Sequence, residues 1–360
     1  MPSRRALLAL LLAARAGPAW ALDASAPAEQ PLRFPADFGA HPETRTEWWY
    51  VTGALEAGDR AWGFQITFFR VPTSIVGADA SRFAARQLLF AHAAVSDLAE
   101  RKMHHDQRIA RAGFGIAEAS VEDTMVVLGD WRLARSDVGG RSRYVAHAAS
   151  ESGAFAFDLV LAASEPLLLQ GDAGVSRKGP RPGQFSRYYS EPQLAARGTL
   201  SVAGRAVQVG GRAWLDHEWS DAYLDPAASG WDWIGMNLDD GGALMAFRIR
   251  RGDGSTLWSG GSHRPRGRTA RAFADGEVVF TPGRTWTSAA TRTRYPVEWQ
   301  VRTPVGTFGV RALQDDQELD SRASTGTIYW EGLSLLLDPD GRRVGRGYLE
   351  MTGYAARLVL

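Results

Sequence analysis

The chain has 360 residues, of which 45% are hydrophobic, and its 41 basic residues nearly balance its 40 acidic ones, for a formal net charge of +1. This balance argues against nucleic-acid binding, which usually brings an excess or a stripe of basic side chains. There is no cysteine, which excludes disulfides, a thiolate metal site, a cysteine nucleophile and a lipidated cysteine. The length suits two domains of ordinary size with sizeable cores.

Residues 1–21 are expected to be a signal peptide. Arg4 and Arg5 precede an apolar run at 6–14 that is too short to span a bilayer, and Ala-Trp-Ala at 19–21 is a small-x-small cleavage site. The paired arginines leave both Sec and twin-arginine export open. No later segment is long and apolar enough for a membrane span. A mature protein without a membrane span, in the periplasm, is therefore expected.

The remaining sequence predicts an all-β fold. Short runs alternate between apolar and polar residues or are rich in aromatic and aliphatic ones, at 62–69, 142–147, 154–161, 244–249 and 329–337. Gly, Asp and Pro separate these runs. Helical periodicity is weak, with a helical turn or two expected only at 193–196 and 314–319. Many short strands with tight turns predict a sandwich or a barrel.

Two irregular stretches interrupt this pattern. The Gly/Pro-rich segment Gly171 to Arg187 is expected to be a long loop. A second stretch at 221–230 marks the expected boundary between an N-terminal domain, residues 30–220, and a C-terminal domain, residues 221–360.

The run Asp216-His217-Glu218-Trp219 is the strongest local candidate for chemistry. In an extended strand, Asp216 and Glu218 share one face, whereas His217 and Trp219 share the other. A histidine that titrates near neutral pH, beside carboxyl groups whose pKa is raised by burial among tryptophans, can transfer protons. The alternative, favoured by the spacing alone, is a structural segment whose acids pair with arginines and whose histidine is hydrogen-bonded in the core.

The run Glu-Trp-Trp-Tyr that begins at Glu47 is a second candidate. Alternation places Trp48 and Tyr50 on one face and Glu47 on the other. Glu47 is a candidate acid, but a structural ion pair with an arginine such as Arg70 or Arg248 is the favoured reading of this residue taken alone.

A third aromatic segment follows at 231–237. Trp231, Trp233 and Asn237 share one of its faces. Such a face fits an apolar cavity with one hydrogen-bonding side chain, and it fits a packed core equally well. The sequence has no HExxH or calcium-loop pattern, no Walker loop, no GxSxG elbow and no dinucleotide fingerprint. Neither a metal nor a cofactor is therefore expected.

Seven strings follow one another along the chain: HPETRTEWWYVTG (41–53), WGFQITFFR (62–70), RQLLFAHAAVSD (86–97), YYSEPQLAARGTL (188–200), WLDHEWS (214–220), GWDWIGMNLDDGGALMAFRIR (230–250) and YWEG with GYLEMTGY (329–354). Together they resemble the AttH / carotenoid 1,2-hydratase family, often labelled predicted secreted hydrolases. The resemblance implies two tandem lipocalin-like antiparallel β-barrel domains and an apolar ligand. Carotenoid hydratases of this family add water across a terminal isoprenoid double bond without a cofactor.

The resemblance also implies roles for single residues. The functional histidine and tryptophan of the hydratases match His217 and Trp219. Their tyrosine and aspartate have no counterpart in residues 244–249, so the acid that protonates an alkene is missing from its expected place. The candidates to replace it are Glu218, Asp216 and Glu47.

Two functions follow as expectations. One is an enzyme that hydrates or hydrolyses a lipid or isoprenoid by acid/base chemistry without a cofactor. The other is a non-catalytic periplasmic lipid-binding accessory of an ABC-type export system, because secreted AttH relatives are often encoded with ABC-transporter components. In both, the predicted ligand contacts are Trp48, Tyr50, Tyr189, Trp219, Trp231, Trp233 and Asn237.

Overall fold

The computed structural model describes residues 31–73 and 84–358, so the expected signal peptide lies outside the described residues. The described chain is built from antiparallel β-strands, with one 3-10 turn, η2 (Ala36–Phe38). Within this part, no helix has the length and apolar character needed to cross a bilayer. The expected all-β fold is confirmed.

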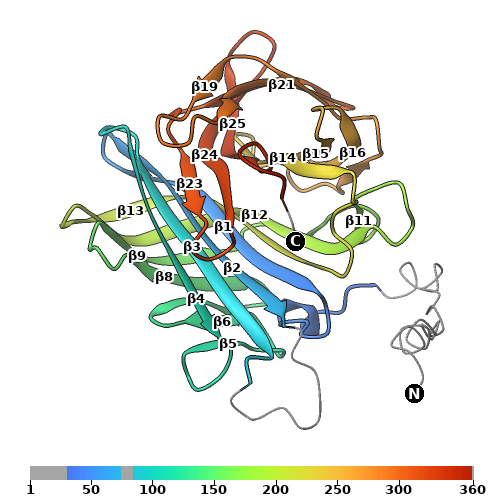
Figure 1. The fold of residues 1–360 in the computed structure, drawn as a ribbon. Helices are drawn as coiled ribbons and strands as arrows, with labels where there is room; N and C mark the ends of the chain where they lie inside the picture. Colours follow the sequence, from blue (N-terminus) through green and yellow to red (C-terminus); the bar gives the residue numbers. More distant parts are fainter. Residues whose placement is uncertain (1–30, 74–83, 359–360) are drawn as a thin grey trace, which may run out of the picture. The chain divides into compact units, whose positions relative to one another are not determined.

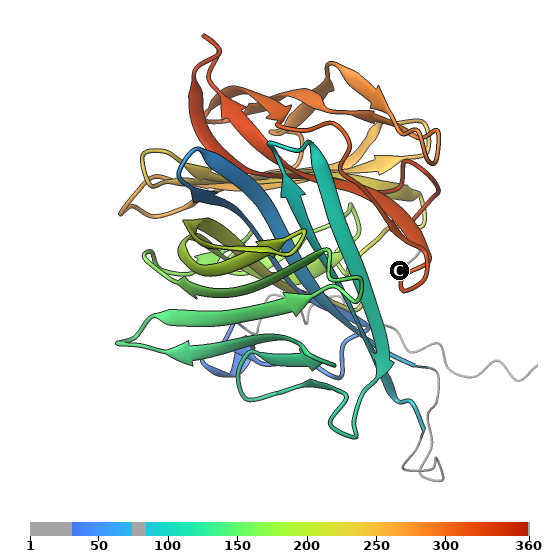
Figure 2. The same ribbon diagram turned by 90° about the vertical axis from the view of Figure 1, so that its left-hand side faces the viewer.

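The first sheet, here called sheet A, contains β1 to β13 in the order β4-β3-β2-β1-β13-β12-β9-β8-β7-β6-β5, with β10 and β11 paired to β12. β4, at one end of this order, lies against β6 near the other end, so sheet A curls into a nearly closed barrel (Figures 1 and 2). Its strands are β1 (Thr46–Ala57), β2 (Arg60–Pro72), β3 (Gln87–Asp97), β4 (Lys102–Arg111), β5 (Ala117–Ala119), β6 (Met125–Leu128), β7 (Trp131–Asp137), β8 (Ser142–Ala149), β9 (Phe155–Ala162), β10 (Leu168–Leu169), β11 (Val175–Arg177), β12 (Phe185–Val202) and β13 (Arg205–Ser220).

The second sheet, sheet B, has the order β17-β16-β15-β14-β25-β24-β22-β21-β18, with β23 paired to β24, and β19 and β20 form a separate pair. Its strands are β14 (Ala228–Leu238), β15 (Ala243–Arg251), β16 (Thr256–Arg264), β17 (Arg271–Phe273), β18 (Val279–Pro282), β21 (Glu298–Thr303), β22 (Gly306–Ala312), β23 (Glu318–Ser321), β24 (Thr327–Leu337) and β25 (Arg343–Met351); the separate pair is β19 (Thr285–Thr287) and β20 (Arg294–Pro296). The chain passes from sheet A to sheet B between β13 and β14, within the predicted boundary stretch. The division into domains 30–220 and 221–360 stays a prediction.

Two details of the predicted elements are wrong. Residues 193–196 are not helical but belong to β12, which has a β-bulge between Glu191 and Leu194 with Gln193 at a positive φ of 60°. The Gln193 side-chain amide holds this bulge by donating to the carbonyls of Leu238 and Gly242 at 2.9 and 2.6 Å. Residues 314–319 are not helical either: 314–317 are irregular and 318–319 begin β23. The expected loop at 171–187 also contains β11 and the first three residues of β12.

Three apolar clusters follow from the alternation of side chains along the strands. One fills the interior of sheet A and includes Trp49 and Phe64, and a second fills the concave side of sheet B and includes Trp330. The third lies between the two sheets and includes Tyr50 and Trp233. Because β1 contributes to the first and the third cluster, its two faces have different surroundings, and the outer one faces sheet B.

Candidate functional site

A cavity of about 490 Å³, here called the inter-sheet pocket, lies where the outer face of sheet A meets sheet B. Its volume is typical of a site for a small organic molecule. Its apolar lining comprises Trp48, Phe69, Val71, Pro72, Leu88, Phe90, Ile109, Trp231, Trp233 and Leu358. Four acidic side chains also line it, namely Asp216, Glu218, Glu331 and Glu350.

The register of sheet A explains why these residues meet. Side chains directly opposite one another on neighbouring strands lie on the same face and in contact distance. One row crosses five strands, and it consists of His92, Thr67, Tyr50, Asp216 and Ser190. The next row on that face, two residues along each strand, consists of Phe90, Phe69, Trp48, Glu218 and Tyr188.

Asp216 is buried and accepts three hydrogen bonds. Its Oδ1 accepts from Ser190 Oγ at 2.5 Å and from Trp214 Nε1 at 2.7 Å, and its Oδ2 accepts from the Tyr188 hydroxyl at 2.7 Å. Burial raises the pKa of Asp216 to about 7, against the lowering effect of these donors. A carboxyl group poised near neutral pH is suited to proton transfer.

Glu218 makes a buried ion pair at the same wall of the pocket. Lys178 Nζ lies 2.7 Å from Glu218 Oε1, and the Ser186 hydroxyl donates to the same oxygen. Burial raises the pKa of Glu218, and the ammonium group of Lys178 opposes this. Three aromatic rings surround that ammonium group at 4.4 to 5.1 Å, those of Phe247, Tyr188 and Tyr223.

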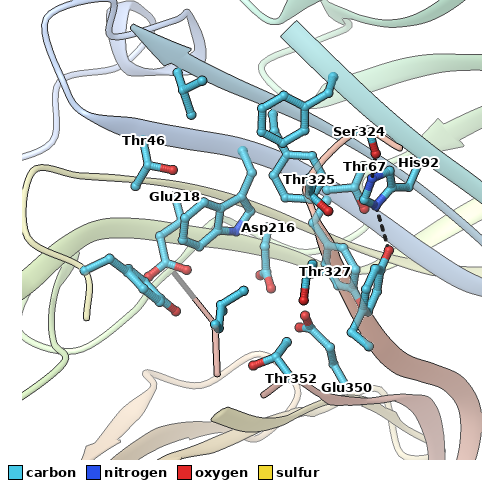
Figure 3. Close-up of a pocket in the computed structure, with 18 of the residues that line it drawn as sticks. Thr46, Thr67, His92, Asp216, Glu218, Ser324, Thr325, Thr327, Glu350 and Thr352 are labelled. Atoms are coloured by element: carbon cyan, nitrogen blue, oxygen red, sulfur yellow. Dashed lines mark hydrogen bonds between the residues drawn. The ribbon is translucent and has the colours of Figure 1, made fainter. Parts of the chain in front are cut away.

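Glu331 and Glu350 come from sheet B and lie directly opposite each other on β24 and β25, with Trp233 of β14 next to Glu350. Both side chains line the pocket, Glu331 buried and Glu350 half-buried, and Figure 3 labels Glu350 beside Thr327 and Thr352. Burial raises the pKa of Glu350 to about 7, and burial together with the charge of Glu350 raises that of Glu331 well above its usual range. Two carboxylates this close cannot both ionise cheaply.

These two glutamates were not among the sequence-predicted site residues. Each stands alone in a short run of otherwise apolar residues, in Tyr-Trp-Glu-Gly-Leu at 329–333 and Tyr-Leu-Glu-Met at 348–351. A lone acid in an apolar strand is costly to bury, so this pattern is a signal that could have identified them.

His92 lies at the opposite end of the row that contains Asp216. Its Nδ1 and Nε2 are each 2.8 Å from a hydroxyl, that of Tyr329 and that of Ser324. Burial lowers the pKa of His92 to about 3, so the imidazole is neutral. His92 therefore ties sheet A to sheet B at the pocket wall.

The predicted site residues are divided between the two faces of their strands. Those that line the inter-sheet pocket are Asp216, Glu218, Trp48, Tyr50, Trp231 and Trp233. Those that lie on the opposite face, toward the interior of sheet A, are Glu47, His217, Trp219 and Tyr189. This division follows the alternation of the strands, because neighbouring residues of a strand point to opposite faces.

Asn237 lines a second cavity of about 660 Å³. Its side chain accepts a hydrogen bond from the Gln193 N–H and donates one to the Ala213 carbonyl.

Glu47 and His217 belong to a buried network inside sheet A. Glu47 accepts from Arg70 Nε at 2.7 Å, from His217 Nε2 at 2.9 Å and from both the main-chain N–H and Nδ1 of His41. The expected ion pair of Glu47 with Arg70 is therefore present. Burial alone would raise the pKa of Glu47, but the hydrogen bonds with His217 and His41 lower it to about 2.

His41 completes this network, here called the His41–Glu47–His217 network. Burial alone would lower the pKa of His41, but its hydrogen bonds with Asp37 and Glu47 raise it to about 9, and its ring stacks on Trp219 at 3.7 Å. Burial lowers the pKa of His217.

The side-chain atoms of His41, Glu47 and His217 that could ligate a metal ion lie within 4.8 Å of one another. The guanidinium group of Arg70 already neutralises Glu47, and a second cation beside it would be repelled.

Comparisons with known proteins agree with this fold. The sequence model of the family described as AttH-like matches residues 25–354. A candidate AttH from Nitrosomonas europaea, known from a crystal structure, is 48% identical, with a TM-score of 0.83 over 91% of this chain and 98% of that one. No protein among the curated ones matches the sequence significantly.

More distant solved structures share the fold. Kievitone hydratase from Nectria haematococca has a TM-score of 0.69 at 15% identity, over 91% of this chain and 94% of that one. CghA has a TM-score of 0.50 at 13% identity, over 87% and 88% of the two chains. At such identities the likeness concerns the fold alone. The expected all-β class is confirmed, with a nearly closed antiparallel barrel in sheet A and a second antiparallel sheet in place of a second described barrel.

Proposed function

The chain belongs to the AttH-like family, and from this membership and the pocket we propose that it binds an apolar small molecule between its two sheets and hydrates or hydrolyses it by acid/base chemistry without a cofactor. The observation that carries this proposal is the set of four carboxyl groups in one pocket, two from each sheet, of which Asp216, Glu218 and Glu331 are buried. A binding pocket without chemistry gains nothing from holding four acids away from water, since each costs stability.

The chemistry requires a carboxylic acid that is still protonated near neutral pH. Burial supplies this condition by raising the pKa of Glu350 to about 7 and that of Glu331 well above its usual range. Protonation of an alkene creates a carbocation, and the indole rings of Trp48, Trp231 and Trp233 line the pocket in which it would form. Each ring can stabilise a desolvated cation by roughly 1–2 kcal/mol.

Incubation of the mature chain with a panel of isoprenoid alkenes and acyl esters is expected to give products that have gained one water, detected by mass spectrometry. Asp216→Asn and Glu350→Gln are each expected to lower the rate by about 100-fold or more, as loss of a general acid or base does. Glu118→Gln, at an exposed position of β5, is the matched control and should leave the rate unchanged. Failure of every substrate class with the wild-type chain would remove the enzymatic proposal.

A second candidate function is a non-catalytic lipid carrier. It is favoured by the position of His217, which matches the functional histidine of the hydratases but lies outside the pocket. Under this proposal the partner is an ABC-type export system, and native mass spectrometry would find a co-purified lipid at a fixed ratio while no substrate of the panel is turned over.

We further propose export to the periplasm by the N-terminal signal. Expression in a bacterial host is expected to give a periplasmic protein whose first residue is Leu22, read by N-terminal sequencing, because the small-x-small site ends at Ala21. Replacing Arg4 and Arg5 by lysines separates the two routes, since only twin-arginine export should stop. A full-length chain that stays in the cytoplasm would contradict the proposal.

A further inference from the structure

We propose that the inter-sheet pocket has an acid side and a base side: Glu331 and Glu350 of sheet B hold a proton that they donate to the substrate, whereas Asp216 and Glu218 of sheet A are carboxylates that accept a proton from the attacking water. This division of roles rests on the proposed acid/base function. It follows from the partners that each carboxyl group has in the protein.

The two acids of sheet A are surrounded by donors. Three donors point at Asp216, from Ser190, Trp214 and Tyr188, and a carboxylate is the form that accepts all of them. Glu218 faces the ammonium group of Lys178 at 2.7 Å, and an opposite charge at this distance favours the ionised acid. Both groups are therefore equipped to be carboxylates.

The two acids of sheet B have the opposite surroundings. Among the described residues, no lysine, arginine or histidine forms an ion pair with Glu331 or Glu350. The ionisable groups that act on them are themselves acidic, namely Tyr50 on β1, Asp216 and Glu218 on β13, and each other across β24 and β25. The indole of Trp231 on β14 is the donor near Glu350. Two adjacent carboxyl groups without a cation retain at least one proton between them.

Unpaired polar atoms mark where a substrate would be held. Within the described part of the chain, neither Oε1 of Glu331 nor the hydroxyl of Tyr50 makes a hydrogen bond of good geometry, although both are buried and the two groups lie close enough to shift each other's pKa. Both residues line the inter-sheet pocket. Buried polar groups are normally well paired, so this pair has hydrogen-bonding capacity left for water or for a hydroxyl or carbonyl oxygen of the ligand. The substrate class that fits is an apolar molecule with one oxygen function close to its reacting double bond.

The four carboxyl groups and one water molecule are sufficient for the hydration of an alkene. The acid pair gives its proton to one alkene carbon, so the π bond is replaced by a C–H bond and a carbocation. A water molecule then forms the C–O bond to that cation, and its proton passes to Asp216 or Glu218. The net change is the addition of one water. The acid pair is reset when the proton on the base side returns to it, directly or through solvent water.

Infrared difference spectroscopy in D₂O tests the division without any substrate. At pH 7 the wild-type chain is expected to show the carbonyl stretch of protonated carboxylic acid. The double substitution Glu331→Gln with Glu350→Gln should remove most of this band, and each single substitution should weaken it. Asp216→Asn and the exposed control Glu118→Gln should leave it in place.

The division of roles would be overturned if the wild-type chain lacks the band, if the double substitution leaves the band unchanged, or if Asp216→Asn removes more of it than the double substitution does. Glutamine has the shape of a protonated glutamic acid, so the variants should fold. If the double variant does not, the two single variants still decide the result. Because the spectrum needs no turnover, the band can be present in a protein that acts only as a carrier, and absent in one that hydrates its substrate. The two proposals therefore fail separately.

Discussion

Glu47→Gln is expected to lower the free energy of unfolding by about 3–5 kcal/mol at pH 6, the cost of removing one partner of a buried ion pair. The side chains of Glu47 and Arg70 are 0% and 1% exposed, so the guanidinium group would keep its charge in the interior without a carboxylate beside it. The two histidines that contact Glu47 would lose the same acceptor. Urea unfolding followed by tryptophan fluorescence measures the change.

A surface pair provides the matched control. Glu298 and Arg284 are 37% and 45% exposed and lie 3.0 Å apart, and Glu298→Gln should change the free energy of unfolding by less than about 1 kcal/mol. If Glu47→Gln has an effect as small as this control, the His41–Glu47–His217 network does not stabilise the fold.

The same network should make the stability depend on pH in two directions. Hydrogen bonds lower the pKa of Glu47 from 4.5 to about 2, so its contribution is present above pH 4.5 and is lost as the pH falls toward 2. The pKa of His41 is raised from 6.5 to about 9, so its contribution is present below pH 6.5 and is lost as the pH rises through 9. Both contributions are complete only between about pH 4.5 and 6.5, and Glu47→Gln should flatten this maximum.

Alternation along single strands is what the sequence could predict. It correctly placed Asp216 and Glu218 on the face opposite to His217 and Trp219, because side chains of a strand point to alternate sides whatever the fold. It could not decide which face meets a ligand. That depends on sheet B lying against the outer face of β1 and β13, a contact between segments far apart in the sequence.

Pairs formed across strands were beyond sequence reasoning for the same reason. Glu331 and Glu350 are 19 positions apart and become neighbours only through the register of β24 and β25. Their approach to Asp216 requires, in addition, the packing of one sheet on the other. Under the proposal above, the acid that the family resemblance led one to seek in residues 244–249 comes from other strands of the same sheet.

Glu350→Gln is expected to raise the free energy of unfolding at pH 7 by about 3 kcal/mol and to have little effect at pH 4. The pKa of Glu350 is raised from 4.5 to about 7, chiefly by burial, so folding favours its protonated form. A group of this kind contributes stability below pH 4.5 that is lost as the pH rises toward 7. The difference between 4.5 and about 7 corresponds to about 3 kcal/mol, at 1.36 kcal/mol for each pH unit.

The substitution also removes the charge that opposes ionisation of Glu331, so the gain at pH 7 should be shared by the pair. Urea unfolding at the two pH values, with Glu118→Gln as an exposed control, measures it. A loss of stability at pH 7 would mean that Glu350 has a favourable ionic partner and is not the proton donor proposed above. If Glu350 is retained for chemistry, the variant should be more stable at pH 7 and should also lose turnover. The acid then lowers the stability of the fold, and its role in the reaction is the reason that it is kept.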